Sequence, residues 1–139
     1  MDYELDDARE RVQRDAVWEF LSTQAYWGRW RCRADLDAQL DSAWRVVGAY
    51  RADTGDLVGF ARAISDGVAF AYLADVFVAE EHRDQGLGRR IVARMIDEGP
   101  GRDFRWTLFT GDAHDLYAGF GFTAPDATAM VRPAAPHMR

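Results

Sequence analysis

The segment RDQGLGRR (residues 83–90) gathers three arginines and two glycines in an otherwise acidic chain. It follows the apolar run VAFAYLADVFV (68–78) and leads into a stretch with helical periodicity. The first N–H groups of a helix lack internal acceptors and lie at the positive end of its dipole. Because Gly86 and Gly88 have no Cβ, an anion can approach those amides, and the arginines add charge. The segment predicts a phosphate or diphosphate site; the alternative is a tight turn before a solvated basic helix.

Asp75 is the only charged residue in the apolar run 68–78. Desolvation would raise its pKa and make it a better general base, whereas the alternative is a buried carboxylate that accepts loop amides or pairs with an arginine. Tyr72, in the same strand, is the second candidate for a catalytic role. Alternation along a strand puts these two side chains on opposite faces, so both can face one substrate only if a bulge intervenes.

The elements that position these residues follow from periodicity and turn signals. Asp66-Gly67 and the RADTGD turn separate three β-prone runs, which predicts an antiparallel meander whose third strand is central. Helical spacing precedes the meander, and Asp35 is the predicted cap of the second of these helices. Asp112 is the predicted cap of a short helix after the meander. The predicted helices are 13–22, 35–42, 86–98 and 112–120, and the predicted strands are 44–50, 57–64, 68–78, 104–110 and a last one from Phe122 that continues through 128–132. This order predicts an α+β sandwich on a mixed sheet.

Bulk properties predict one soluble, cytoplasmic domain over residues 1–139, with 132–139 as a flexible tail. The net charge of −6 argues against nucleic-acid binding, since no global positive field attracts a polyanion. Cys32 is the only cysteine, which excludes an internal disulfide and disfavours a thiolate metal site. The acidic start is unlike a secretory signal, and no apolar run reaches membrane-spanning length.

Two motifs together resemble the GNAT superfamily of acyl-CoA-dependent N-acyltransferases. VFVAEEHRDQGLG is similar to its acetyl-CoA-binding segment, with Arg83, Gly86 and Gly88 at the fixed positions of Arg/Gln-x-x-Gly-x-Gly/Ala. Downstream, DAHDLYAGFGF is similar to the family's Ala-x-x-Leu-Tyr-x-x-x-Gly-Phe segment; the matching residues are Ala113, Leu116, Tyr117, Gly121 and Phe122. The resemblance covers 44–123 well and the first 43 residues weakly.

The resemblance implies a mixed, mostly antiparallel sheet flanked by helices on both faces. It also implies a bulge in strand 68–78, which then splays from the next strand and leaves main-chain groups near Phe77 and Val78 free for pantetheine. The backbone from about Gln85 to Arg90 would hold the diphosphate of acetyl-CoA, without a metal. The implied cofactor-binding residues are Val76, Phe77, Val78, Arg83, Asp84, Gln85, Gly86, Leu87, Gly88, Arg89, Arg90, Asp112 and Tyr117.

Tyr117 matches the family's tyrosine, which implies a general acid for the leaving thiolate; the alternative is a core residue at helical spacing. The segment YWGRWR (26–31) falls where the superfamily commonly lines its acceptor pocket. Its aromatic and guanidinium groups could recognise a planar or carboxylate-bearing amine, or could staple helices to the sheet with the arginines in water. The substrate-binding candidates are Tyr26, Trp27, Arg29, Trp30 and Arg31.

We therefore expect an N-acetyltransferase that moves acetyl from acetyl-CoA directly to an amine of a small molecule or peptide. The alternatives are a catalytically silent acyl-CoA-binding sensor or regulatory module and an unrelated phosphate-binding domain. No nucleic-acid or membrane partner is expected, and an exposed terminal strand would allow a homodimer.

Overall fold

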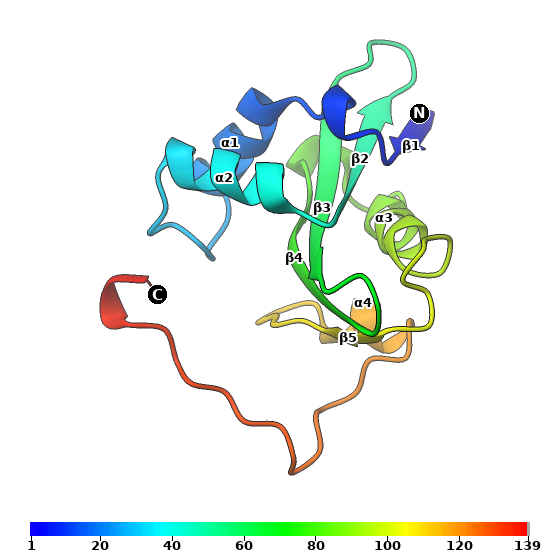
Figure 1. Cartoon of the computed structure of the whole chain (residues 1–139). Coiled ribbons are helices and arrows are strands. Elements are labelled where there is room, and N and C mark those ends of the chain that lie inside the picture. The colour runs from blue at the N-terminus through cyan, green and yellow to red at the C-terminus, as the bar shows by residue number, and fades with distance from the viewer. Residues whose placement is uncertain (139) are drawn as a thin grey trace.

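A five-stranded sheet forms the centre of the molecule, and helices cover both of its faces (Figure 1). The computed structural model describes residues 1–138. The strands are β1 (Tyr3–Asp6), β2 (Arg45–Arg51), β3 (Leu57–Ser65), β4 (Phe70–Val78) and β5 (Arg105–Thr107). The helices are α1 (Arg14–Thr23), α2 (Arg33–Ser42), α3 (Leu87–Met95) and α4 (His114–Ala118), with short 3-10 turns at Arg9–Arg11, Glu80–His82 and Pro136–Met138.

The strands follow one another across the sheet in chain order. Neighbours are antiparallel from β1 to β4, whereas β5 runs parallel to β4. Helices α1 and α2 lie on one face and α3 on the other (Figure 1). The predicted fold class is therefore confirmed. No helix within residues 1–138 has the length and apolar content needed to cross a bilayer.

The sheet separates two hydrophobic cores. On the first face, α1 buries Val17, Phe20 and Leu21 against the sheet, at the one-face spacing that predicted this helix. On the second face, α3 buries a stripe of four side chains, Leu87, Ile91, Val92 and Met95. Strand alternation serves both cores, since in β2 Val46 faces the first and Val47 the second.

Strand β4 changes face at Asp75. Arg62 pairs with Ala74 and Phe60 pairs with Phe77, so two residues of β4 oppose the single residue of β3 between them. Asp75 has a φ of 54°, in the left-handed region, as a β-bulge allows. Residues four apart in a regular strand share a face, yet Leu73 packs in the second core and Phe77 in the first. The bulge implied by the resemblance is confirmed.

Strands β4 and β5 separate beyond the bulge. They pair only where Phe70–Tyr72 meets Arg105–Thr107, although β4 continues to Val78. The second half of β4 therefore has no strand partner on its β5 side among the described residues. The implied splay is confirmed, and it leaves room between the two strands for a ligand.

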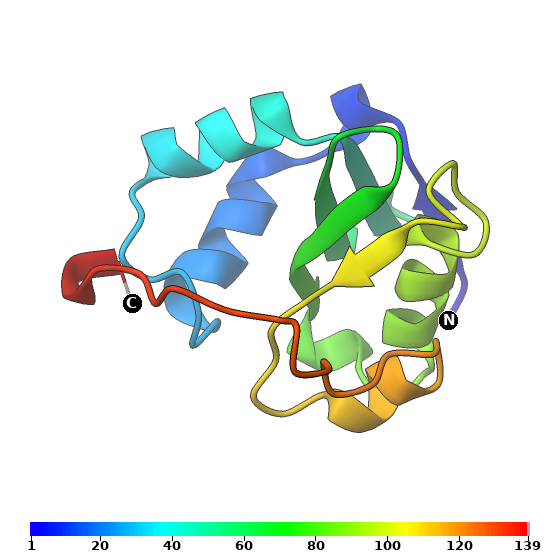
Figure 2. The ribbon, with the colours of Figure 1, turned by 60° about the horizontal axis from the view of Figure 1, so that its bottom comes forward.

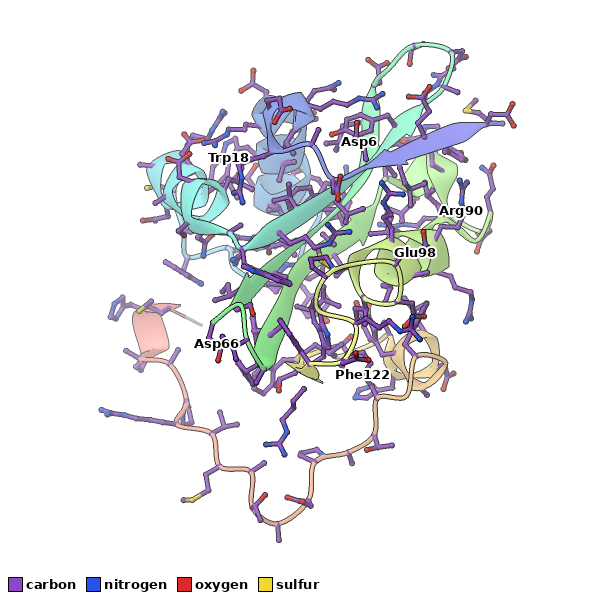
Figure 3. All side chains as sticks on the ribbon, turned by 45° about the vertical axis from the view of Figure 1, so that its right-hand side comes forward. Asp6, Trp18, Asp66, Arg90, Glu98 and Phe122 are labelled. Carbon is purple, nitrogen blue, oxygen red and sulfur yellow. The ribbon has the colours of Figure 1, made fainter. Side chains whose placement is uncertain are left out.

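The β3–β4 turn confirms the predicted hairpin. The Asp66 carboxylate accepts hydrogen bonds from three successive amides, those of Val68, Ala69 and Phe70, at 2.8, 2.9 and 3.2 Å. Gly67 supplies the left-handed conformation that the turn requires, with a φ of +78°. Asp66 lies at the tip of this hairpin (Figure 3).

Both predicted helix caps are wrong by a few residues. Helix α2 begins at Arg33 with Cys32 as its N-cap, and Asp35 is the third helical residue, whose carboxylate accepts the Cys32 amide at 2.9 Å. A carboxylate at that position completes a capping box instead of starting the helix. Helix α4 has Ala113 as its N-cap and no side-chain cap, so Asp112 is free for another role.

The predicted last strand from Phe122 through 128–132 is wrong. Residues 123–135 form no strand or helix, and all side chains from 123 to 138 are exposed. Pro125 and Pro133 remove backbone donors there, which disfavours a ladder. The segment leaves α4 as a long loop and ends on the α1/α2 side (Figures 1 and 2). The homodimer stays a prediction, but the terminal strand offered as its reason is not formed.

Strand β1 was not predicted. It pairs with β2 from Tyr3 opposite Arg51 to Asp6 opposite Gly48. Tyr3 and Leu5 pack against the second core, whereas Glu4 between them is exposed. This is period-two alternation, but two apolar residues among many acidic ones are too few to reveal it.

Arginine provides the cation in every ion pair among the described residues. The sequence contains 17 arginines and no lysine. Arg45, for example, binds Asp7 at 2.7 Å and also donates to the carbonyls of Arg94 and Met95 at the end of α3. Guanidinium groups thus tie the sheet to its covering helices.

Candidate active site

The turn between β4 and α3 presents a row of free backbone N–H groups. The amides of residues 84–89 donate to no acceptor among residues 1–138, and the first helical bond runs from the Arg90 amide to the Gly86 carbonyl at 3.1 Å. Gly86 has a φ of +75°, and a Cβ built there would meet nothing within 4 Å. The amides are therefore unpaired and the space over Gly86 is open, as an anion site requires.

Arginines flank this turn on three sides. The Arg83 Nε donates to the Val78 carbonyl at 3.0 Å, which holds that guanidinium at the end of β4. Arg89 reaches α4, where its Nη1 would be 2.9 Å from a Cβ at Gly119. Arg90 points outward at the edge of the molecule (Figure 3). Leu87 is buried in the second core, so only its backbone can contact a ligand. These residues fit the diphosphate of a coenzyme.

A cavity of about 530 Å³ opens beside the splayed strands. The 26–31 loop, β3, the bulged part of β4 and the 108–113 segment form its walls. Its aromatic lining consists of Tyr26, Trp27, Trp30, Tyr72, Phe109 and Tyr117. Among the described residues, no group of three or more His, Cys, Asp or Glu side chains is arranged to hold a metal ion.

Tyr72 and Asp75 line the same cavity. A regular strand would have separated them, and the bulge at Asp75 brings both to one side. Tyr72 is half-buried, with its ring centroid 6.0 Å from that of Phe109. Burial raises the pKa of Tyr72, more than the nearby charge of Arg62 lowers it, so the phenol is protonated at neutral pH.

Asp75 forms a buried ion-pair cluster with two arginines. Its Oδ1 accepts from Arg31 Nη2 at 2.7 Å and from Trp27 Nε1 at 2.9 Å. Its Oδ2 accepts from Arg31 Nη1 at 2.8 Å and from Arg62 Nε at 2.6 Å. Burial acts to raise the pKa of Asp75, but the Arg31 hydrogen bonds and the Arg62 charge outweigh it and hold the pKa below its ordinary value. The expected raised pKa is therefore wrong, and the arginine-paired alternative is confirmed.

Tyr117 is both a core residue and a cavity residue. It is 8% exposed, packs in the second core and lies edge-on to Phe122 at 5.8 Å between ring centroids. Its hydroxyl has no hydrogen-bond partner among residues 1–138 and is not among their fully buried unpaired atoms, and the residue lines the cavity. Burial, followed by the negative charge of Asp112, raises the pKa of Tyr117 to about 12. The phenol is therefore protonated and free to donate.

The predicted acceptor segment lies at the cavity, with one exception. Tyr26, Trp27, Trp30 and Arg31 line it, whereas exposed Arg29 does not and instead donates to the Ala25 carbonyl. The Tyr26 hydroxyl accepts the Gly111 amide at 2.9 Å and lies 3.4 Å from Asp112, which joins this loop to the segment before α4. Trp27 also packs against the first core, so this segment both lines the cavity and holds to the core, while acceptor binding stays a prediction.

The cofactor-binding candidates on β4 differ in what they expose. Val76 lines the cavity. The Phe77 side chain stacks on Phe20 at 4.1 Å between ring centroids, inside the first core. Phe77 can therefore contribute only through its backbone, and the Val78 carbonyl is already engaged by Arg83.

Sequence reasoning missed Arg62. This residue lies on β3 opposite Ala74, lines the cavity and binds Asp75, with only 7% of its side chain exposed. A signal was present, because Arg62 is the only charge in the otherwise apolar run LVGFARAI (57–64). Gln39 and Phe109 also line the cavity, and nothing in their local sequence marks them.

Comparisons with known proteins agree with this geometry. The profile of the acetyltransferase (GNAT) family matches residues 6–122. A Xanthomonas campestris pv. campestris protein, named as belonging to the GNAT family, has a crystal structure with a TM-score of 0.90 and 28% identity, over 99% of this chain and 96% of that one. The crystal structure of a Deinococcus radiodurans R1 protein, named as an acetyltransferase, matches with a TM-score of 0.72 and 25% identity, over 94% of this chain and 89% of that one.

A Gibberella zeae protein, also named as an acetyltransferase, is 35% identical over 75 residues. The match spans 54% of this chain but only 40% of that protein. The family profile, by contrast, covers most of the chain, including the β4–α3 turn and α4. The chain belongs to the acetyltransferase (GNAT) family.

Proposed function

We propose that the protein is an acetyl-CoA-dependent N-acetyltransferase that transfers acetyl directly to an amine of a small molecule or peptide. One observation carries the proposal: the unpaired amides of residues 84–89 lie at the end of the strand whose bulge lines the cavity. A coenzyme held by its diphosphate at this turn can extend along the open side of β4 toward Tyr117. Phosphate binding and the reaction space are thus joined by one strand.

When bound, acetyl-CoA supplies a thioester whose acetyl group passes to the amine nitrogen, with the coenzyme's thiol as the leaving group. The turn amides with Arg83 and Arg89 hold the diphosphate, and main-chain groups of β4 near Val76 orient the thioester. Positioning of this kind provides a large part of the acceleration, because a fixed donor and acceptor no longer pay the entropy of encounter.

Tyr117 is the general acid in this proposal. The amine nitrogen forms the new C–N bond, the C–S bond breaks, and the Tyr117 hydroxyl gives its proton to the departing sulfur. The proton that the nitrogen loses passes through water in the open cavity and restores the phenol. Tyr117 is a buried residue whose hydroxyl is not among the fully buried unpaired atoms, so the hydroxyl keeps access to the cavity that Tyr117 lines and is well placed to donate in this way.

Asp75 and Tyr72 are not assigned the role of base. Both Asp75 oxygens accept two hydrogen bonds each, and the low pKa of this carboxyl disfavours protonation. Tyr72 is a neutral phenol at working pH because burial raises its pKa. Asp75 instead acts as a positioning residue for Arg31 and Arg62, and Tyr72 contributes to the cavity wall.

Ligand binding and turnover test the proposal separately. Acetyl-CoA should raise the melting temperature, and a panel of primary amines should then release free thiol. Stabilisation without thiol release from any amine would indicate a silent acyl-CoA-binding module. Stabilisation by simple nucleotides but not by acetyl-CoA would indicate a different phosphate ligand and contradict the proposed function.

A further inference from the structure

The cavity contains a buried surplus of positive charge. The Arg31, Arg62 and Asp75 side chains are 3%, 7% and 3% exposed, and neither arginine forms an ion pair with any other carboxylate of residues 1–138. Within this buried cluster two cations thus share one anion, which leaves one net positive charge. The other carboxylate that lines the cavity, Asp112, is exposed and contacts the Tyr26 and Thr110 hydroxyls instead of these arginines. Burying an uncompensated charge is costly unless a counter-ion accompanies it. A ligand with a negative charge would supply that counter-ion.

The two arginines differ in what they have left to donate. Both terminal nitrogens of Arg31 are bonded to Asp75, and one also donates to Gln39 Oε1 at 2.7 Å. Its Nε is fully buried and has no acceptor among the described residues. Arg31 is therefore held in place as part of the cavity floor, and it contributes charge more than free donors.

Arg62 presents a free guanidinium end. Its Nε is committed to Asp75 at 2.6 Å, but neither terminal nitrogen donates to any residue in the described chain. Those nitrogens are also absent from the fully buried unpaired atoms, which are Arg31 Nε and the Tyr50 hydroxyl, so they keep access to the cavity that Arg62 lines. Arg62, held in place by its bond to Asp75, thus directs its two terminal nitrogens into the cavity as hydrogen-bond donors.

The surrounding walls are apolar and aromatic. Trp27, Trp30, Tyr72 and Phe109 line the same space, and Phe109 is 65% exposed at its edge. Such surfaces bind the apolar or planar body of a ligand, while the arginine binds an anionic group. Two terminal N–H groups of one guanidinium match the two oxygens of a carboxylate.

We infer that the amine acceptor carries a carboxylate, which Arg62 binds through its two terminal nitrogens, together with an apolar or aromatic body. That the ligand carries a reacting amine rests on the proposed function. That it carries a carboxylate rests on the Arg62 site and does not depend on the proposed function. A carboxylate carries one charge and neutralises the surplus of one, whereas a phosphate dianion would replace it with an excess of negative charge. Amino acids and other small amino carboxylates are the chemical class that fits.

The first experiment compares reaction products, so that it does not depend on turnover. Calorimetry measures binding of N-acetylphenylalanine and of N-acetylphenethylamine, which share a ring and an acetamide and differ in the carboxylate. We expect the acid to bind about 10- to 100-fold more tightly, the effect of a charge-assisted hydrogen bond. Equal binding of the pair, or no binding of the acid, overturns the inference. Acetyl-CoA calorimetry on the same sample reports on the proposed function independently.

Variants then assign the preference to Arg62. In Arg62→Gln, the ratio of the dissociation constants of N-acetylphenethylamine and N-acetylphenylalanine should fall to nearly one. In Arg62→Lys, which keeps the charge but not the two-nitrogen fork of the guanidinium, this ratio should fall in part. Arg51→Gln is the matched control, because Arg51 is also a strand arginine bonded to an aspartate, Asp53, away from the cavity. A preference that survives in Arg62→Lys unchanged would overturn the role given to the fork, even if Arg62→Gln does not fold.

Thiol release with matched amines distinguishes the kind of anion. β-Alanine and O-phosphoethanolamine place a carboxylate and a phosphate at similar distances from a primary amine. We expect a higher kcat/KM with the carboxylate, and a higher value with the phosphate would overturn the carboxylate assignment. If no amine releases thiol while N-acetylphenylalanine still binds through Arg62, the carboxylate site stands and the proposed function fails.

Discussion

Arg62 Nε and Asp75 Oδ2 lie 2.6 Å apart at the bulge in the pairing of β3 with β4. The bulge that reverses the side-chain alternation of β4 also directs the Asp75 carboxylate toward Arg31 and Arg62. The irregularity in the strand therefore shapes the cavity. Asp75 thereby gains four hydrogen bonds and loses the free oxygen that a base would need. Its role is to hold guanidinium groups in position, and this role can be measured as stability.

Replacing Asp75 by asparagine should be strongly destabilising. The change keeps the shape of the side chain but leaves two buried arginines without an anion, at a cost of about 3–5 kcal/mol in the free energy of unfolding. Urea denaturation measures the change. Asp53→Asn is the control, because Asp53 pairs with Arg51 in water and its loss should leave the midpoint nearly unchanged. Similar midpoints for Asp75→Asn and wild type would contradict the buried cluster.

Acid should reduce the stability of the wild type through the same carboxyl. Because the folded-state pKa of Asp75 lies below its ordinary value of 3.8, the folded form favours the ionised group. The stabilisation is present above pH 3.8 and is lost as the pH falls through the lower folded-state pKa. Unfolding free energies measured from pH 5 to pH 2 should fall more steeply for wild type than for Asp75→Asn. Parallel curves would mean that Asp75 is not the titrating group.

Gly86→Trp should weaken acetyl-CoA binding by about 100-fold, the loss of one or two charge-assisted hydrogen bonds to the turn amides. The new side chain would fill the open space over those amides. Gly55→Trp is a close control, since Gly55 has a φ of +77° and equally open surroundings in the turn before β3. Both variants place a side chain at a positive φ and so introduce the same kind of backbone strain. Calorimetry should therefore find weaker acetyl-CoA binding in Gly86→Trp and not in Gly55→Trp.

Tyr117→Phe should lower kcat by about 100-fold or more while leaving the acetyl-CoA dissociation constant unchanged, because a general acid acts mainly in the transition state. Tyr50→Phe provides the comparison. Tyr50 is fully buried, lies outside the cavity, and burial likewise raises its pKa to about 12. Its hydroxyl has no partner among residues 1–138, so its removal should be tolerated. Equal turnover in Tyr117→Phe and wild type would remove Tyr117 from the mechanism.

The pH dependence of turnover follows from the same phenol. A pKa of about 12 keeps Tyr117 protonated up to pH 10 and beyond. The kcat/KM profile should therefore rise once, as the acceptor amine loses its proton, and show no falling limb up to pH 10. Tyr117→Phe should lower the whole curve without moving that rise. A falling limb between pH 8 and pH 10 in the wild type, absent in Tyr117→Phe, would show that the phenol ionises there.

The parts of the fold that the sequence predicts are those governed by local chemistry. The Asp66-Gly67 turn, the α3 stripe and the glycines of residues 86 and 88 each depend on neighbours in the chain. The 26–31 segment was placed at the cavity by resemblance, and Arg29 shows the limit of that reasoning, since its guanidinium turns to the Ala25 carbonyl.

Long-range pairing accounts for what could not be predicted. Whether Asp75 has a raised or lowered pKa depends on Arg31 and Arg62, which are 44 and 13 residues away in sequence. Strand β1 requires β2 as its template, and the strand expected after Phe122 does not form although β5 is an edge strand of the sheet. In each case the outcome is decided by a contact that no local pattern encodes.

The exclusive use of arginine in the ion pairs of residues 1–138 would have a chemical consequence if the protein binds acetyl-CoA, a reactive thioester, as proposed above. A lysine ε-amine that loses its proton is itself a nucleophile, and capping it with an acyl group would erase the charge on which a salt bridge depends. Guanidinium groups stay protonated at any working pH. The ion pairs that fix the sheet, the helices and the Asp75 cluster thus contain no amine that could be acylated. Their side chains do not compete with the acceptor amine for the acetyl group.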